Sequence, residues 1–191
     1  MKKIILTLVL CCFGVAMFAQ GAKFGITAGL NVSNITGDVS NTKYKAGFQA
    51  GVVADFGITN NFSIIPELLY SQKGYKIDGA GDLVGATTET LNYLVLPINA
   101  AYKIDAGYGS KVIVFAGPYL GYGISANNNL KFGSNASEIK PLDFGVNVGL
   151  GYQYEKIFFK LQYNLGLASM SNATNASIKN SNIGVTVGYM F

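Results

Sequence analysis

Apolar side chains alternate with small or polar ones through much of the sequence, and this alternation limits the fold more than any other feature. In residues 23–34, the apolar positions are Phe24, Ile26, Ala28, Leu30 and Val32. The positions between them are Lys23, Gly25, Thr27, Gly29, Asn31 and Ser33. Successive side chains of a β-strand point to opposite faces. A period of two therefore predicts a strand with one apolar face and one polar face.

Eight segments of this kind account for most of the chain. The predicted strands cover residues 23–34, 43–57, 61–75, 90–104, 111–125, 142–155, 157–168 and 182–191. They are long for a soluble sandwich, where about five or six residues are usual. A membrane barrel needs about 9–11 residues in each tilted strand. We therefore predict an all-β fold, an eight-stranded antiparallel up-and-down transmembrane β-barrel.

The predicted connections alternate between long and short. Long ones lie near residues 35–42, 76–89, 126–141 and 169–181, and short ones at residues 58–60, 105–110 and 155–156. Outer-membrane barrels have short periplasmic turns and longer extracellular loops. This parity predicts an outer-membrane protein of a diderm bacterium with both termini in the periplasm.

The face opposite the apolar one is rich in glycine. Its glycines include Gly25, Gly29, Gly47, Gly51, Gly117, Gly121, Gly145, Gly149, Gly184 and Gly188. Such a face has too few charges for the exterior of a soluble protein, but it suits the crowded interior of a narrow barrel. We therefore predict that the apolar face contacts lipid. Aromatic residues such as Phe24, Tyr102 and Tyr189 fall near the predicted periplasmic strand ends, as in an interfacial girdle.

The residue types that the chain lacks exclude several kinds of chemistry. There is no His, so Ser–His–Asp, Cys–His and HExxH sites are excluded. The two cysteines, Cys11 and Cys12, are adjacent and do not form a CxxC site. The net charge of +4 comes from Lys without Arg, a poor pattern for reading nucleic-acid bases. We expect a protein that is not an enzyme, with no catalytic residue, metal site, cofactor or nucleic-acid partner.

The N-terminus has the pattern of a secretory signal peptide. Lys2 and Lys3 precede an apolar run at residues 4–15, and Ala19 places a small residue before the expected cleavage bond. We predict a signal peptide at residues 1–19 and a barrel domain at residues 20–191. The alternatives are an anchor helix, for which the run is short, and a lipoprotein signal, for which Leu10 is a poor residue before Cys11.

Charged residues on the inward register form a candidate polar cluster in the lumen. They are Lys45, Asp55, Glu67, Lys103, Asp143 and Lys160. One interpretation is an ion or proton path; the other is a plug of salt bridges. An eight-stranded lumen is only wide enough to be filled by side chains, which favours the plug, and we expect Glu67 to pair with a lysine. The acids Asp78, Asp82 and Glu89 are assigned to a loop and are too scattered to predict a calcium site.

The C-terminal residues 184–191 continue the alternation to the last residue, Phe191, on the lipid-facing register. This ending, with Gly184 and Tyr189, resembles the C-terminal assembly signal of outer-membrane barrels. The resemblance implies recognition by the barrel-assembly machinery during insertion.

Several other stretches are similar to the bacterial outer-membrane β-barrel family that includes the PorT-like proteins. They are PELLYSQKG at 66–74, YLVLPI at 93–98, GPYLG at 117–121 and the opening residues 23–31. The resemblance covers essentially the whole mature chain and implies an eight-stranded outer-membrane barrel. The PorT protein is associated with secretion and maturation of exported proteins, but the resemblance assigns that role to no particular residue.

The function predicted from these features is non-enzymatic. We expect a structural, scaffold or secretion-accessory component that acts through loops 76–89 and 126–141. Its expected partners are outer-membrane lipids and an envelope or secretion protein. The alternatives are a narrow pore for ions or small solutes, a soluble lipocalin-like ligand binder, and a membrane-embedded hydrolase that uses a base other than His.

Overall fold

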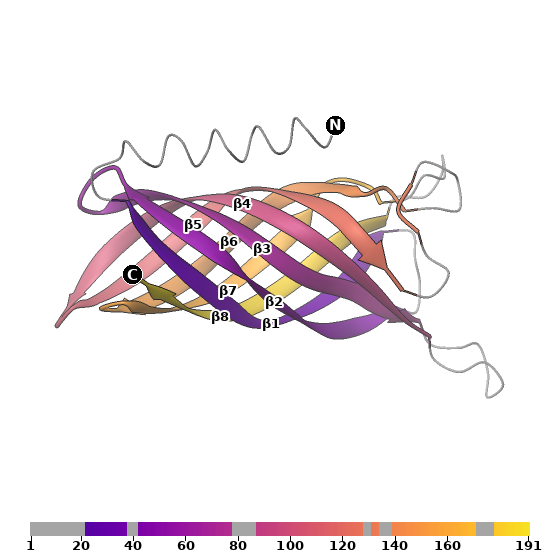
Figure 1. Cartoon of the computed structure of the whole chain (residues 1–191), viewed down its shortest axis with the longest axis horizontal. Helices are drawn as coiled ribbons and strands as arrows, with labels where there is room; N and C mark the ends of the chain where they lie inside the picture. Colours follow the sequence, from indigo (N-terminus) through magenta and orange to yellow (C-terminus); the bar gives the residue numbers. More distant parts are fainter. Residues whose placement is uncertain (1–21, 38–41, 78–86, 128–130, 134–138, 171–177) are drawn as a thin grey trace.

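The protein is a closed barrel of eight antiparallel strands, seen from the side in the computed structural model of Figure 1. The structure describes residues 22–37, 42–77, 87–127, 131–133, 139–170 and 178–191. The strands are β1 (Lys23–Gly37), β2 (Thr42–Gly57), β3 (Phe62–Ile77), β4 (Thr87–Gly107), β5 (Ser110–Ala126), β6 (Leu142–Tyr154), β7 (Ile157–Gly166) and β8 (Ile178–Met190). Each strand pairs with the next, and β8 closes on β1. The predicted fold class is confirmed.

Two further findings concern the N-terminus and helices. The predicted signal peptide at residues 1–19 lies outside the described residues. Within the described ranges, no helix is long and apolar enough to cross a membrane.

Several strand ends differ from the sequence prediction. β4 begins at Thr87 instead of residue 90 and β8 at Ile178 instead of residue 182, whereas β7 ends at Gly166, two residues early. At the starts of β4 and β8 the side-chain alternation is weak, but the backbone ladders continue, with Thr87 opposite Ile77 and Ile178 opposite Gly37. At the end of β7 the ladder stops at Gly166, although the apolar alternation runs on to Leu167. A strand ends where its hydrogen-bonded partner ends, and a single-strand pattern does not contain that information.

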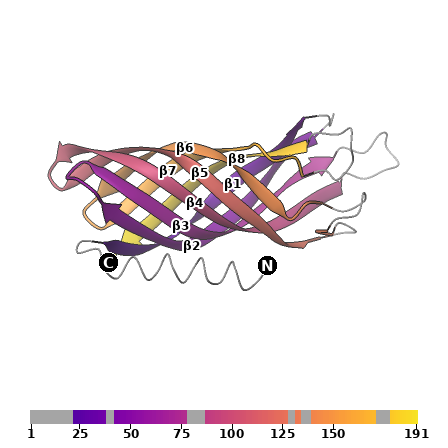
Figure 2. The ribbon, with the colours of Figure 1, turned by 90° about the horizontal axis from the view of Figure 1, so that it is seen from above.

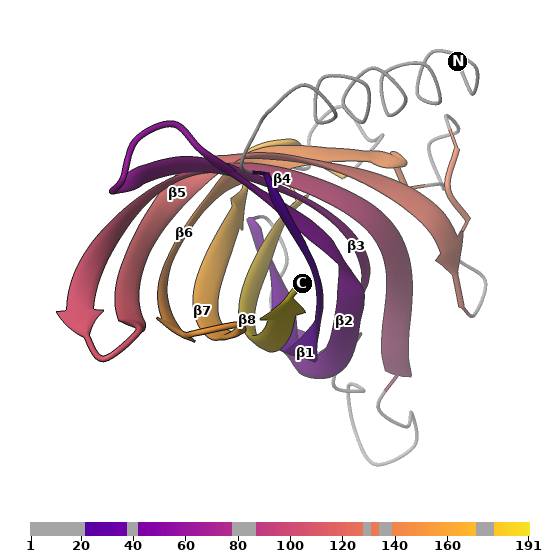
Figure 3. The same cartoon turned by 60° about the vertical axis from the view of Figure 1, so that its left-hand side comes forward.

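The two ends of the barrel differ, as the connection lengths predicted. We call one the short-turn end; it has the connections 58–61, 108–109 and 155–156 and the C-terminal Phe191. Tyr108 and Glu155 in these turns have φ angles of 51° and 49°, as expected for two-residue hairpin turns. The other, the long-loop end, has the connections 38–41, 78–86, 127–141 and 167–177. Figure 3 brings the short-turn end forward, and Figure 2 shows the steep tilt of the strands from above.

The strands have their apolar faces outward. Leu30, Val148 and Leu161 expose 69%, 52% and 52% of their surface. An exterior of this kind is unfavourable in water because exposed apolar surface costs about 25 cal/mol per Å², but it is compatible with lipid. The predicted orientation of the two faces is confirmed, and it is the reverse of what a soluble lipocalin-like barrel needs.

The interior is packed with side chains of both kinds. Apolar clusters lie on its β3–β5 wall toward the long-loop end, around Leu69, Tyr93 and Tyr119, and toward the short-turn end, around Ile113 and Phe115. A further apolar group, Val53, Phe158 and Met190, lies near the short turns. The remaining inward positions are mostly amide, hydroxyl and charged side chains, and these make the lumen the candidate site.

Candidate functional site: the barrel lumen

Three ion pairs cross the lumen at different heights. Lys73 in β3 pairs with Asp143 in β6, Lys160 in β7 with Glu67 in β3, and Lys103 in β4 with Asp55 in β2. Five of the six predicted cluster residues are therefore in ion pairs: Asp55, Glu67, Lys103, Asp143 and Lys160. All these positions are on the inward register of long strands, so the side chains meet although they are far apart in sequence.

The pair nearest the long-loop end is Lys73–Asp143. Its Nζ–Oδ2 distance is 3.2 Å, and the two side chains are 1% and 0% exposed. The Asn180 amide donates to the same Oδ2 at 2.9 Å, and the Tyr119 hydroxyl donates to Oδ1 at 3.4 Å. Lys73 Nζ also lies 5.1 Å from the ring centroids of both Tyr93 and Tyr119. This network satisfies both charges, as buried charges require.

Sequence reasoning missed Lys73. Glu67 is on the inward register of the predicted strand 61–75, and the same alternation within that strand places Lys73 on the inward face. The signal was therefore present in the sequence.

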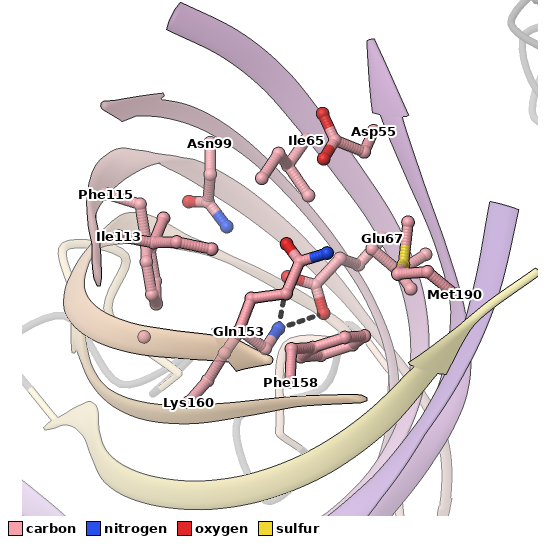
Figure 4. Close-up of a pocket in the computed structure, with 12 residues that line it drawn as sticks. Asp55, Ile65, Glu67, Asn99, Ile113, Phe115, Gln153, Phe158, Lys160 and Met190 are labelled. Carbon is pink, nitrogen blue, oxygen red and sulfur yellow. Dashed lines mark hydrogen bonds and ion pairs between the residues drawn. The ribbon is translucent and has the colours of Figure 1, made fainter. Parts of the chain in front are cut away.

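The second pair, Glu67–Lys160, lies closer to the short turns (Figure 4). Lys160 Nζ donates to both carboxylate oxygens of Glu67 at 2.5 Å. Its ammonium also lies 5.9 Å and 5.7 Å from the ring centroids of Phe115 and Phe158. A cavity of about 30 Å³ adjoins this pair and is also lined by Asn99, which is space for no more than a few water molecules.

The third pair, Lys103–Asp55, lies at the short-turn mouth, where its side chains are 11% and 9% exposed. The Asn61 amide in the β2–β3 turn donates to the Lys103 carbonyl at 2.9 Å. This hydrogen bond ties the turn to the strand that carries the pair. The side chains of this pair are together more accessible to solvent than those of the other two pairs.

Lys45, the remaining predicted cluster residue, is buried in β2 near the long-loop end. Its Nζ lies 3.4 Å from the Ala46 carbonyl, and no carboxylate of the described residues is within ion-pair distance. It sits where the β2–β3 register shifts, between Tyr44 and Gln49.

The assignment of Glu89 to a loop is wrong. It lies in β4 opposite Tyr75 and is 8% exposed, because the β3–β4 ladder extends further than the alternation indicated. Asp78 and Asp82 lie outside the described residues. The part of the chain that is described has no group of three or more side chains able to hold a metal ion.

The C-terminal residues lie at the seam where the barrel closes. Tyr189 and Phe191 are exposed on the outer surface, with ring centroids 5.9 Å apart in an edge-to-face arrangement. The Phe191 amide donates to the Phe24 carbonyl at 2.8 Å. Gly184 forms lumen wall beside the Gln49 side chain.

The arrangement as a whole is a filled interior. A second cavity, beside Gln49, Gln162 and Asn164, measures about 10 Å³. Among the described residues, each carboxylate of the predicted cluster (Asp55, Glu67 and Asp143) has a lysine partner. These features fit a plug better than an open pore.

Comparison with known proteins agrees with this architecture. A sequence profile described as "Outer membrane protein beta-barrel domain" matches residues 18–172. The crystal structure of Neisserial surface protein A is similar, with 17% identity, a TM-score of 0.54, and coverage of 90% of this chain and 100% of that one. At this level of identity the likeness concerns the fold alone.

Two further solved structures are more distant. The E. coli outer membrane protein W has 16% identity and a TM-score of 0.47, covering 89% of this chain and 98% of that one. The attachment invasion locus protein of Yersinia pestis, crystallised with the heparin analogue sucrose octasulfate, has 15% identity and a TM-score of 0.46, with coverage of 89% and 99%. No curated protein sequence is significantly similar to this chain.

Proposed function

Because the chain belongs to the outer membrane protein beta-barrel domain family and is a small eight-stranded outer-membrane barrel, we propose that it is a non-enzymatic structural or scaffold component that acts through its extracellular loops. The observation that carries this proposal is the filled lumen. Within the described residues, three ion pairs cross it, and the two cavities inside the lumen measure about 30 and 10 Å³. An interior of this kind leaves the loops as the surface available to a partner.

The proposal includes an orientation. The short turns and both termini of the barrel would face the periplasm, and the connections at 78–86 and 127–141 would face the exterior. The alternation of short and long connections supports this orientation, since it is the usual arrangement of outer-membrane barrels. Tyr189 and Phe191 at the barrel seam would then be available to the assembly machinery from the periplasm.

Cysteine labelling tests the orientation. Cys11 and Cys12 are the only cysteines of the chain and belong to the predicted signal peptide. Single variants Asn60→Cys, in a short turn, and Lys131→Cys, at the long-loop end, place one thiol at each end of the barrel. A membrane-impermeant maleimide should label only K131C in intact cells and both variants in broken cells. Labelling of N60C in intact cells would overturn the orientation.

The resemblance to PorT-like proteins supports a role in an envelope or secretion assembly. The test is extraction of native outer membranes in mild detergent, followed by sizing of the wild type and of variants in which 79–85 or 128–138 is replaced by a short Gly-Ser turn. We expect a complex larger than the monomer that both replacements reduce and that substitutions in the short turn 58–61 leave intact. A monomer in every case would contradict the scaffold role.

The narrow-pore alternative predicts a different result. An ion pore gives discrete conductance steps in a planar bilayer, whereas a plugged barrel gives none. Reproducible steps from the purified barrel would favour the pore and overturn the plug.

A further inference from the structure

The lumen contains a row of asparagines that the proposed interaction role does not use. Asn147 in β6 is directly opposite Asn164 in β7, which is directly opposite Asn182 in β8. The row continues to Ser33 in β1, opposite Asn182, and in the other direction to Gly117 in β5, opposite Asn147. Five neighbouring strands thus present one continuous strip of small and polar groups along the lumen wall.

The row reaches the short-turn end through Asn99. A Cβ atom on Gly117 would collide with the backbone at Ile98 and Asn99, so glycine allows the β4 and β5 backbones to meet closely there. The Asn99 side chain lines the cavity of about 30 Å³ that also contacts Asp55 and Glu67, as Figure 4 shows. The strip therefore begins at this cavity, near the short-turn end.

The row reaches the long-loop end through Ser33. The Ser33 hydroxyl donates to the Gly74 carbonyl at 2.9 Å and lies 3.4 Å from the Lys45 carbonyl. Gly74 itself is flanked by the Lys45 side chain and the Glu89 backbone. Polar groups therefore line one wall from the short-turn mouth to Lys45 and Glu89, while the apolar clusters occupy other parts of the interior.

Six of the eight amide atoms of these asparagines have no hydrogen-bond partner among the described residues. Within the described residues, neither amide atom of Asn147 or Asn182 has a hydrogen-bond partner, and the same holds for Oδ1 of Asn99 and Asn164. These four side chains are all at least nine-tenths buried. The same feature is found at the two ends of the strip. Among the described residues, Asp55 Oδ1 and Glu89 Oε2 are buried without a hydrogen-bond partner. Buried polar atoms almost always have a hydrogen-bond partner, either protein or ordered water.

Water is the ligand that fits these atoms. A water molecule donates and accepts at once, and it needs about 10–15 Å³ of free volume and two to four polar neighbours. The cavity at Asn99 and the smaller one of about 10 Å³ at Asn164 supply that space at two points on the row. Ions are a poor fit, since the row is neutral and an ion would lose its hydration without a charged group to replace it.

From this juxtaposition we propose that the asparagine row carries a file of water through the barrel, from the Asp55–Asn99 cavity to Lys45 and Glu89. The protein then conducts water and excludes ions. This activity is independent of the proposed interaction role, which depends on the loops.

Osmotic shrinkage of proteoliposomes tests the water path. Vesicles containing the full barrel should shrink faster in stopped-flow light scattering than vesicles without protein, with no matching rise in K⁺ flux. The double variant Asn147→Leu, Asn182→Leu keeps the side-chain shape but removes the amides, and it should lose the excess water permeability. Tyr93→Phe, in the apolar cluster of the β3–β5 wall and outside both cavities, is the matched control and should keep it.

The outcomes are decisive in each case. Wild-type vesicles that shrink no faster than empty ones, or a double variant as permeable as the wild type, would overturn the water path. K⁺ flux that rises with water flux would overturn the exclusion of ions. The double variant should fold, because it removes buried amides that lack partners, and circular dichroism checks this. If it does not fold, the single variant Asn164→Leu takes its place with the same expectation.

Discussion

The pair Lys73–Asp143 should be strongly coupled in the stability of the barrel. Its atoms lie 3.2 Å apart, and both side chains are essentially inaccessible to solvent. With an effective dielectric constant of about 20, the Coulomb attraction at this distance is about 5 kcal/mol. Desolvation of the two charges offsets most of this gain, but removal of one partner leaves the other charge buried, which costs about 3–5 kcal/mol.

The two single substitutions should differ in magnitude. Asp143→Asn leaves the buried Lys73 ammonium without a countercharge, beside two aromatic rings each 5.1 Å away, so it should cost about 3–5 kcal/mol. Lys73→Met should cost less, because Asp143 keeps its hydrogen bonds from Asn180 and Tyr119. The double variant K73M/D143N leaves no buried charge at this site. It should recover most of the loss, which gives a coupling energy of about 2–3 kcal/mol.

Equilibrium unfolding in guanidinium chloride measures this cycle in detergent micelles or lipid vesicles. The chain has no Trp, so far-UV circular dichroism is the suitable probe. The matched control is the same cycle with Lys103→Met and Asp55→Asn at the short-turn mouth, where the side chains are 11% and 9% exposed. Its greater solvent access should lower its coupling below that of the inner pair. Additive effects at the inner pair, or equal coupling at both pairs, would refute the reasoning.

Three further predictions concern the wall and the terminus of the barrel. Gly117→Val should destabilise folding by about 1–3 kcal/mol through overpacking, because the new side chain meets the β4 backbone; an unchanged denaturation midpoint would contradict this close approach. Val148→Lys on the outer face should cost about 2–4 kcal/mol if the site is near the bilayer midplane, and Leu142→Lys near the long-loop end should cost less; equal effects in vesicles would argue against the lipid-facing assignment. Deletion of Phe191 should lower the amount of folded barrel in the outer membrane of cells with little change in its stability after refolding in detergent; normal cellular levels would argue against an assembly signal.

The sequence alone was sufficient for the outline of the molecule. The alternation with period two places each strand residue on one of two faces whatever the strand pairs with, so the lipid face and the lumen face were both predicted. The connection lengths predicted the two unlike ends. The inward location of Lys45, Glu67, Lys103, Asp143 and Lys160 follows from the same alternation. Lys73 follows from it too, since it shares the inward register of Glu67 within the predicted strand 61–75.

The alternation did not predict where the strands end or which side chains of neighbouring strands meet. Glu89 lies in a polar stretch that reads equally well as loop or strand, and only its pairing with Tyr75 places it in β4. Asn147, Asn164 and Asn182 look like ordinary inward residues along the chain. They form one row only because β6, β7 and β8 pair in a particular register.

The division between sequence and tertiary structure has a simple physical cause. Alternation is a local property of each strand, and it determined that this chain is a barrel with an apolar exterior and a polar interior. Which inward side chains meet depends on how the strands are staggered when the barrel closes. That stagger brings Lys73 to Asp143 across 70 residues and Lys160 to Glu67 across 93. Only the closed structure decided these contacts. The stagger is set by backbone hydrogen bonds, and because every residue type makes the same backbone hydrogen bonds, the sequence of one strand does not indicate its register with the next.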